Sequence, residues 1–163
     1  MARHPTTGLP EKSMSYLNKV RECNNAKLDA FIPLCVTGRA VGRLKPEFAT
    51  HLAAWPDLFQ VTESQVELHP RLDNAAARTC AVAQVTDRLV RAGVIDRHHG
   101  EKYPARAQGQ ADAAFLLDRA AAPYFGIRAF GQHINGFVRD AGGLKLWVGR
   151  RAQGKPTFPG KLD

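Results

Sequence analysis

The sequence predicts an α+β fold: a small N-terminal domain of hairpins and helices, followed by the first strands of an incomplete mixed sheet. Short apolar runs that alternate with polar residues and end at turn residues indicate β-hairpins. Longer segments with apolar residues every three or four positions indicate amphipathic helices between them. From about residue 125 onward the helical spacing gives way to alternation, which favours strands up to residue 163.

The chain begins with a stretch that carries little structural signal. Residues 1–13 are polar and are interrupted by proline and glycine, which predicts a flexible leader. Met1 and Met14 are both candidate initiators. Ser13 is a candidate N-cap for a helix over residues 14–25.

Two hairpins with a helix between them are expected next. Residues 31–44 alternate around a turn at Gly38 and predict the first hairpin. Pro46 suits the first turn of a helix that runs to Trp55. Residues 57–70 alternate again and predict the second hairpin.

The longest helix is expected over residues 74–94. Asp73 is expected to cap it, and Gly93 is the expected terminator. Apolar residues recur every four positions on the face that should be buried: Ala77, Ala81, Val85 and Leu89.

A strand-and-turn region is expected over residues 94–107, and the segment ADAAFLLDRAAA at 111–122 predicts a further helix that ends before Pro123. Three consecutive bulky residues of this helix are expected to be buried: Phe115, Leu116 and Leu117. Residues 127–151 then alternate around the pair Gly142-Gly143, which predicts a strand–turn–strand unit.

Basic residues are concentrated toward the end of the chain. Of a formal net charge of +8, residues 125–163 contribute +5, from seven basic and two acidic residues. Such an excess favours an anionic partner, either phosphate groups or nucleic acid. The candidate binding residues are cations and aromatic side chains, which suit a ligand with phosphates and a flat ring: Arg150, Arg151, Lys155, Lys161, Trp147 and Phe158.

Other chemistries receive little support. Neighbouring His98 and His99 point opposite ways in extended backbone and have no cysteine nearby, so a solvated pair is preferred to a zinc site. His133 is expected to be a hydrogen-bonded strand residue. Motifs for a serine nucleophile, a dinucleotide or a P-loop are missing, and the three irregularly spaced cysteines are expected to be reduced thiols.

No apolar run reaches the roughly 18–20 residues that a membrane span needs, and the first residues lack the apolar middle of a signal peptide. A cytoplasmic protein without a membrane partner is therefore expected.

Three motifs, FGIRAFGQHINGFV, LWVGRR and KPTFPGKLD, carry a resemblance to a known family. With MSYLNKV and the segment that follows it, they resemble the thiamine-pyrophosphokinase-related Nudix hydrolases over residues 14–163. The resemblance implies an N-terminal accessory domain over residues 14–124. It also implies the beginning of a Nudix domain over residues 125–163, truncated before the Nudix box, so that Asp163 falls within a domain.

The resemblance implies an intact enzyme that uses Mg²⁺, held by the glutamates of a signature helix, to hydrolyse a nucleoside- or thiamine-type diphosphate. This chain has no glutamate after Glu101. No catalytic residue and no metal ligand can therefore be assigned, no cofactor is expected to bind this chain, and the chain alone is predicted to be inactive. The six cationic and aromatic residues named above would lie on the substrate side.

Two other functions stay open. A small basic module for nucleic acid is disfavoured because the basic residues are few and no RNP motif is present. An interaction module would dock a partner or a second copy of the chain, with the exposed strand edges of the C-terminal segment as the pairing surface.

Overall fold

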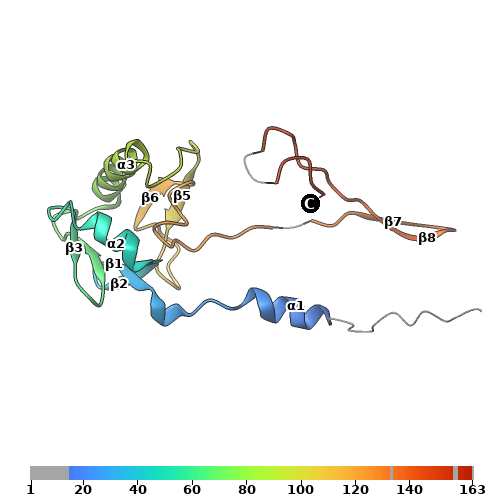
Figure 1. Cartoon of the computed structure of the whole chain (residues 1–163), viewed down its shortest axis with the longest axis horizontal. Coiled ribbons are helices and arrows are strands. Elements are labelled where there is room, and N and C mark those ends of the chain that lie inside the picture. Colours follow the sequence, from blue (N-terminus) through green and yellow to red (C-terminus); the bar gives the residue numbers. More distant parts are fainter. Residues whose placement is uncertain (1–14, 133, 156–157, 163) are drawn as a thin grey trace, which may run out of the picture. The chain divides into compact units, whose positions relative to one another are not determined.

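The computed structural model of the chain describes residues 15–132, 134–155 and 158–162 (Figure 1). The chain divides into two compact units, one up to Arg128 and one from Ala129 onward. The strands form several small sheets, and helices occur between them, so the predicted α+β class is confirmed.

The main sheet of the first unit has four strands in the order β2-β1-β4-β3. Its members are β1 (Ile32–Val36), β2 (Arg39–Leu44), β3 (Phe59–Val61) and β4 (Val66–Leu68). Each predicted hairpin is an antiparallel pair, and the two hairpins join through parallel pairing of β1 with β4. Gly38 sits in the tight turn of the first hairpin with a φ of +72°, a conformation that glycine adopts without strain.

The first two helices are short. Helix α1 (Tyr16–Cys23) begins at Ser15, whose Oγ accepts a hydrogen bond from the Leu17 amide, and it buries none of its residues. Ser13, the predicted cap, lies outside the described residues. A single 3-10 turn (Leu28–Ala30) precedes β1, and α2 (Pro46–Leu52) follows β2 with proline in its first turn, as predicted.

Helix α3 (Ala75–Arg91) has a different cap from the one predicted. Asn74, not Asp73, precedes the first helical residue, and its Oδ1 accepts from the Ala77 amide at 2.9 Å. Asp73 instead accepts from the Asn74 side chain. Both residue types are good caps, so only the backbone geometry decides between neighbours.

The predicted helix over residues 111–122 is wrong, because the segment forms β6 (Phe115–Asp118), paired with β5 (Lys102–Ala105). Phe115 and Leu117 are buried whereas Leu116 is 40% exposed, which is the period of a strand. Tertiary contacts favour the strand: the Leu116 amide donates to Thr79 Oγ1 on α3 at 2.9 Å. The alanine-rich flanks favour a helix only weakly, and packing overrides that preference.

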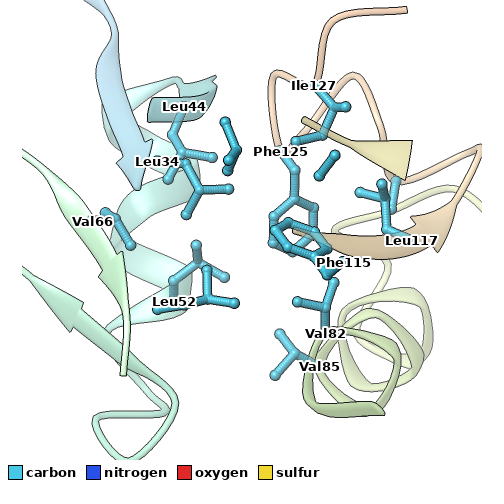
Figure 2. Close-up of a cluster of buried hydrophobic side chains, with 14 of the residues drawn as sticks. Leu34, Leu44, Leu52, Val66, Val82, Val85, Phe115, Leu117, Phe125 and Ile127 are labelled. Carbon is cyan, nitrogen blue, oxygen red and sulfur yellow. The ribbon is translucent and has the colours of Figure 1, made fainter. Parts of the chain in front are cut away.

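The core of the first unit lies between two groups of elements (Figure 2). The four-stranded sheet and α2 supply one side, including Leu34, Leu44 and Leu52. Helix α3, the β5–β6 pair and the chain just after them supply the other, including Val85 and Phe115. Each fully buried side chain of this size contributes roughly 1.5–3 kcal/mol, so this cluster is the main source of stability.

Residues 125–127 pack into that core, although the domain boundary predicted from the sequence placed them in the C-terminal segment. Phe125 is fully buried and Ile127 is 7% exposed. The Arg43 amide donates to the Gly126 carbonyl at 3.1 Å, which fixes this stretch against β2. A Cβ at Gly126 would lie 1.7 Å from the Arg43 carbonyl oxygen, so only glycine fits there.

The second unit contains one hairpin, β7 (Phe137–Asp140) paired with β8 (Gly143–Leu146). The predicted strand–turn–strand arrangement is present, but its first strand begins at Phe137 rather than at residue 127. Regular pairing ends with the strands, and one further bond joins the Trp147 amide to the Gly136 carbonyl. All eight strand residues are exposed.

Candidate functional site

The hairpin of the second unit is closed by a polar turn. Asp140 Oδ1 accepts from the Gly142 amide at 2.8 Å, and its Oδ2 forms an ion pair with Lys145. The Lys145 ammonium, and then the Gly142 amide, hold the pKa of Asp140 below its usual value. Since Asp140 is the sole acidic residue between 129 and 162, this pairing occupies the one carboxylate in that range.

A second closure brings three of the predicted cations together. Arg150 forms an antiparallel bridge with Leu162, and the Arg151 amide donates to the Lys161 carbonyl at 2.9 Å. The Gly160 amide donates back to the Arg151 carbonyl, and Arg150 Nη1 donates to the Gly160 carbonyl at 3.0 Å. Arg150, Arg151 and Lys161 therefore share the neck of one loop.

The other predicted residues lie before and within this loop. The Lys155 amide donates to the Ala152 carbonyl in a turn near the start of the loop. Trp147 precedes the neck and is 73% exposed, while Phe158 within the loop is 69% exposed and has a φ of +47°. We call these six residues, Arg150, Arg151, Lys155, Lys161, Trp147 and Phe158, the cation–aromatic loop.

The cation–aromatic loop contains residue types that can contact an anion with a flat ring. Guanidinium groups donate paired hydrogen bonds to phosphate oxygens, and exposed indole and phenyl rings can stack on a flat ring. The six side chains can bind and orient a phosphate ligand by charge and stacking.

A magnesium site built from several protein side chains would need clustered carboxylates. Mg²⁺ prefers several carboxylate or water oxygens in octahedral geometry. Among residues 15–132, 134–155 and 158–162, no group of three or more His, Cys, Asp or Glu side chains is placed to hold a metal ion.

A buried acid in the first unit has a structural role. Asp118 accepts hydrogen bonds from the amides of His99, Gly100 and Ala120 at 2.8–2.9 Å. Burial alone would raise the pKa of Asp118, but these three amides and the nearby His98 outweigh it, so its pKa lies below its usual value. The carboxylate thus fixes the loop before β5 onto the end of β6.

The tandem histidines are exposed in that loop, as predicted, but they have acidic neighbours. His98 Nε2 lies 3.1 Å from Asp87 Oδ1, and His99 Nδ1 lies 3.8 Å from Glu101 Oε2. His133 lies outside the described residues. The three cysteines are free thiols: Cys35 is buried, which raises its pKa, and the other two are exposed.

Sequence reasoning missed a groove on the first unit, between α2 and the end of α3. Its polar lining includes His51 and Trp55 at one wall and Arg88 and Arg91 at the other. The spacing of three along α3 placed Arg88 and Arg91 on one helical face, whereas Trp55 lies beyond the end of α2 at Leu52. That signal was present, but nothing in the sequence indicated that this face and Trp55 line one groove.

Comparison with known proteins shows the family of the chain. Residues 15–129 match the family described as "Domain of unknown function (DUF4743)", and the chain belongs to this family. The match covers the helices and sheets of the first unit from α1 onward.

Relatives extend the similarity into the second unit. The chain is 39% identical over 152 residues to "Nudix hydrolase 24, chloroplastic" and 36% identical over 159 residues to "Nudix hydrolase 20, chloroplastic", both of Arabidopsis thaliana. Each alignment covers 91% of this chain and 42% of the relative, so the chain spans under half their length. An uncharacterized protein of Saccharomyces cerevisiae is 31% identical over 112 residues, covering 66% of this chain and 32% of that protein. The chain is thus related to proteins named Nudix hydrolases.

In the part of the chain that the structure describes, no helix is long and apolar enough to cross a membrane. Cytoplasmic location remains a prediction, and the names of the two Arabidopsis relatives contain the word chloroplastic.

Proposed function

We propose that this chain is the N-terminal portion of a Nudix hydrolase that acts on a nucleoside- or thiamine-type diphosphate. The observation that carries the proposal is the cation–aromatic loop, which gathers Arg150, Arg151 and Lys161 at one neck with exposed rings on either side. The names of the two Arabidopsis relatives support the class of enzyme.

In this proposal the second unit binds substrate and does not cleave it. The arginines and lysines hold the diphosphate oxygens, and Trp147 or Phe158 stacks on the ring of the nucleoside or thiamine part. Mg²⁺ would neutralise phosphate charge and activate water. Its carboxylate ligands would come from residues outside these 163, so the chain by itself is expected to release no phosphate.

Binding without turnover tests the proposal. Thiamine diphosphate and a nucleoside diphosphate are titrated into the chain by calorimetry, and phosphate release is followed in parallel with Mg²⁺. We expect binding of at least one ligand and no turnover. Arg150→Gln with Arg151→Gln should weaken binding about tenfold or more, because charge-assisted hydrogen bonds to phosphate are lost.

The matched control is Arg128→Gln with Arg139→Gln, which removes two exposed positive charges outside the cation–aromatic loop. An equal loss of affinity in this control would show that overall charge and not the loop binds the ligand. Robust turnover by the purified chain would contradict the assignment of the carboxylates to residues elsewhere.

A second candidate, binding of single-stranded nucleic acid, rests on the same exposed rings beside basic residues. The salt dependence of oligonucleotide binding tests this function. Tight binding that falls steeply with salt would favour this function over diphosphate binding. No binding at low salt would remove it.

Pairing of two copies through the hairpin edges is a third possibility for the second unit. All residues in both strands of the hairpin are exposed, and exposed strand edges are surfaces for pairing with another chain. Sedimentation over a range of concentrations tests it, since a strict monomer would exclude it.

A further inference from the structure

A groove of about 710 Å³ lies open on the first unit, where α2 and the last turn of α3 approach each other. Its apolar floor includes Leu89 and Val94, and its polar walls carry one hydroxyl, one imidazole, one indole and two guanidinium groups. No carboxylate lines it. The groove belongs to the domain of unknown function and uses no residue of the cation–aromatic loop.

Two arginines of the groove, Arg88 and Arg91, stand in the last turn of α3 and are exposed. Neither the Arg88 nor the Arg91 guanidinium forms a hydrogen bond or ion pair with another residue in the described ranges. Backbone amides accompany the end of α3, since Ala92 donates to the Arg88 carbonyl at 2.9 Å and Gly93 to that of Val90 at 3.0 Å.

In the aromatic wall Trp55 packs against the core, while His51 is exposed beside Phe48. The His51 ring lies 6.4 Å from the Phe48 ring, and Phe48 packs edge-on against buried Phe125 at 5.1 Å. Trp55 is half-buried and packs against the same core cluster. Binding on a half-buried Trp55 ring costs little entropy, because packing against the core already orders that ring.

We propose that this groove binds a small anion attached to an aromatic ring, of the class of an aryl phosphate. The phosphate lies between Arg88 and Arg91, whose planar donors match its oxygens, and the ring lies on Trp55 beside His51. The inference is independent of the diphosphate function proposed for the second unit, because the two sets of residues are on different units.

Intrinsic fluorescence makes this groove observable on its own. The chain has two tryptophans, so Trp147→Phe leaves Trp55 as the sole indole reporter. Phenyl phosphate is titrated into this variant of the full chain, with inorganic phosphate and phenol in parallel. We expect a saturable change in Trp55 emission, with phenyl phosphate binding about tenfold or more tighter than either fragment.

Substitution then identifies the contacts. Arg88→Gln with Arg91→Gln should weaken phenyl phosphate binding about tenfold or more. Arg39→Gln with Arg97→Gln, a control with the same loss of charge at exposed sites outside the groove, should leave it unchanged. Arg150→Gln with Arg151→Gln should also leave the Trp55 signal unchanged, which separates this site from the cation–aromatic loop.

An unchanged Trp55 signal at about millimolar phenyl phosphate would overturn the proposal. Equal affinity for inorganic phosphate or phenol would also overturn it, as would equal loss in the two pairs of arginine variants. Since all four arginines of the comparison are exposed, circular dichroism is expected to show native folding in each variant.

Discussion

The two units of the chain differ in whether their apolar side chains are buried or exposed. Every buried hydrophobic residue in the described ranges lies at or before Ile127. Beyond it, the described part of the second unit exposes Phe137, Leu146 and Trp147 by 62–73%. The first unit buries its apolar side chains between two layers, whereas the second holds its shape mainly by backbone pairing around turns.

This difference shows which unit contains the stabilising core. A core fixes geometry because removing any part leaves a cavity. A lone hairpin has only marginal stability in water. The exposed rings and cations of the second unit are accessible to solvent. Matched substitutions in the two units test whether stability depends on the first unit more than on the second.

The largest effect is expected from an aromatic residue in each unit. Phe115→Ala should lower the free energy of unfolding by about 3–5 kcal/mol, because Phe115 is fully buried. Phe137→Ala, at an exposed site, should change it by less than about 0.5 kcal/mol. Urea denaturation followed by circular dichroism measures both, and similar losses in the two would refute the contrast.

A glycine comparison should give the next effect. Gly126→Ala forces a Cβ against the Arg43 carbonyl at a φ of +58°, so a loss of about 2–3 kcal/mol is expected. Gly131→Ala meets nothing within 4 Å and should leave stability nearly unchanged. Thermal melts of the two variants decide whether the close approach of residue 126 to β2 matters.

Asp118 should make the first unit sensitive to acid. Its folded-state pKa is lowered, so the carboxylate contributes stability above its unfolded pKa of roughly 3.9, and this contribution is lost as pH falls through the folded pKa. Asp118→Asn should cost about 1–2 kcal/mol at pH 7, because the amide nitrogen cannot accept the bonds that Oδ2 accepts.

The acid test compares urea midpoints at pH 7 and at about pH 3. Wild type should lose stability more than Asp118→Asn does over this range. Asp112→Asn, at an exposed carboxylate, serves as the control. Parallel pH profiles for wild type and Asp118→Asn would show that the carboxylate does not hold the loop.

The smallest effect is expected at the turn of the second unit. Lys145→Gln removes the ion pair with exposed Asp140, and such surface pairs contribute little in water. Global unfolding should be unchanged, while the pKa of Asp140 rises toward its usual value, because the ammonium that favoured the carboxylate is gone. NMR titration of the Asp140 carboxyl measures the shift, and an unmoved pKa would contradict the pairing.

Several elements could be predicted from local sequence because local forces specify them. The hairpin turns at Gly38, and α3 ends at Arg91, two residues before Gly93. Both features follow from backbone preferences that need no distant contact. The strand at Phe115 could not be predicted this way. Its neighbours are alanine-rich, and its alternation appears only once β5 and Thr79 hold it in place.

The candidate site divides along the same line. The residue types of the cation–aromatic loop could be selected from the sequence, because charge and aromatic character are properties of single residues. The closure that joins Arg151 to Lys161 depends on pairing between residues ten apart, which composition does not specify. The groove between α2 and α3 was missed because its walls are far apart in the chain.

The sequence by itself determined the α+β class, both hairpins of the four-stranded sheet and the basic character of the last residues, since turn chemistry, periodicity and charge are encoded locally. Only the tertiary structure decided that residues 115–118 form a strand and that residues 125–127 complete the core. It also decided that Arg88 and Trp55 line the same groove. The physical reason is that burial and pairing are shared between distant segments, so their free energy belongs to the contact and to neither segment alone.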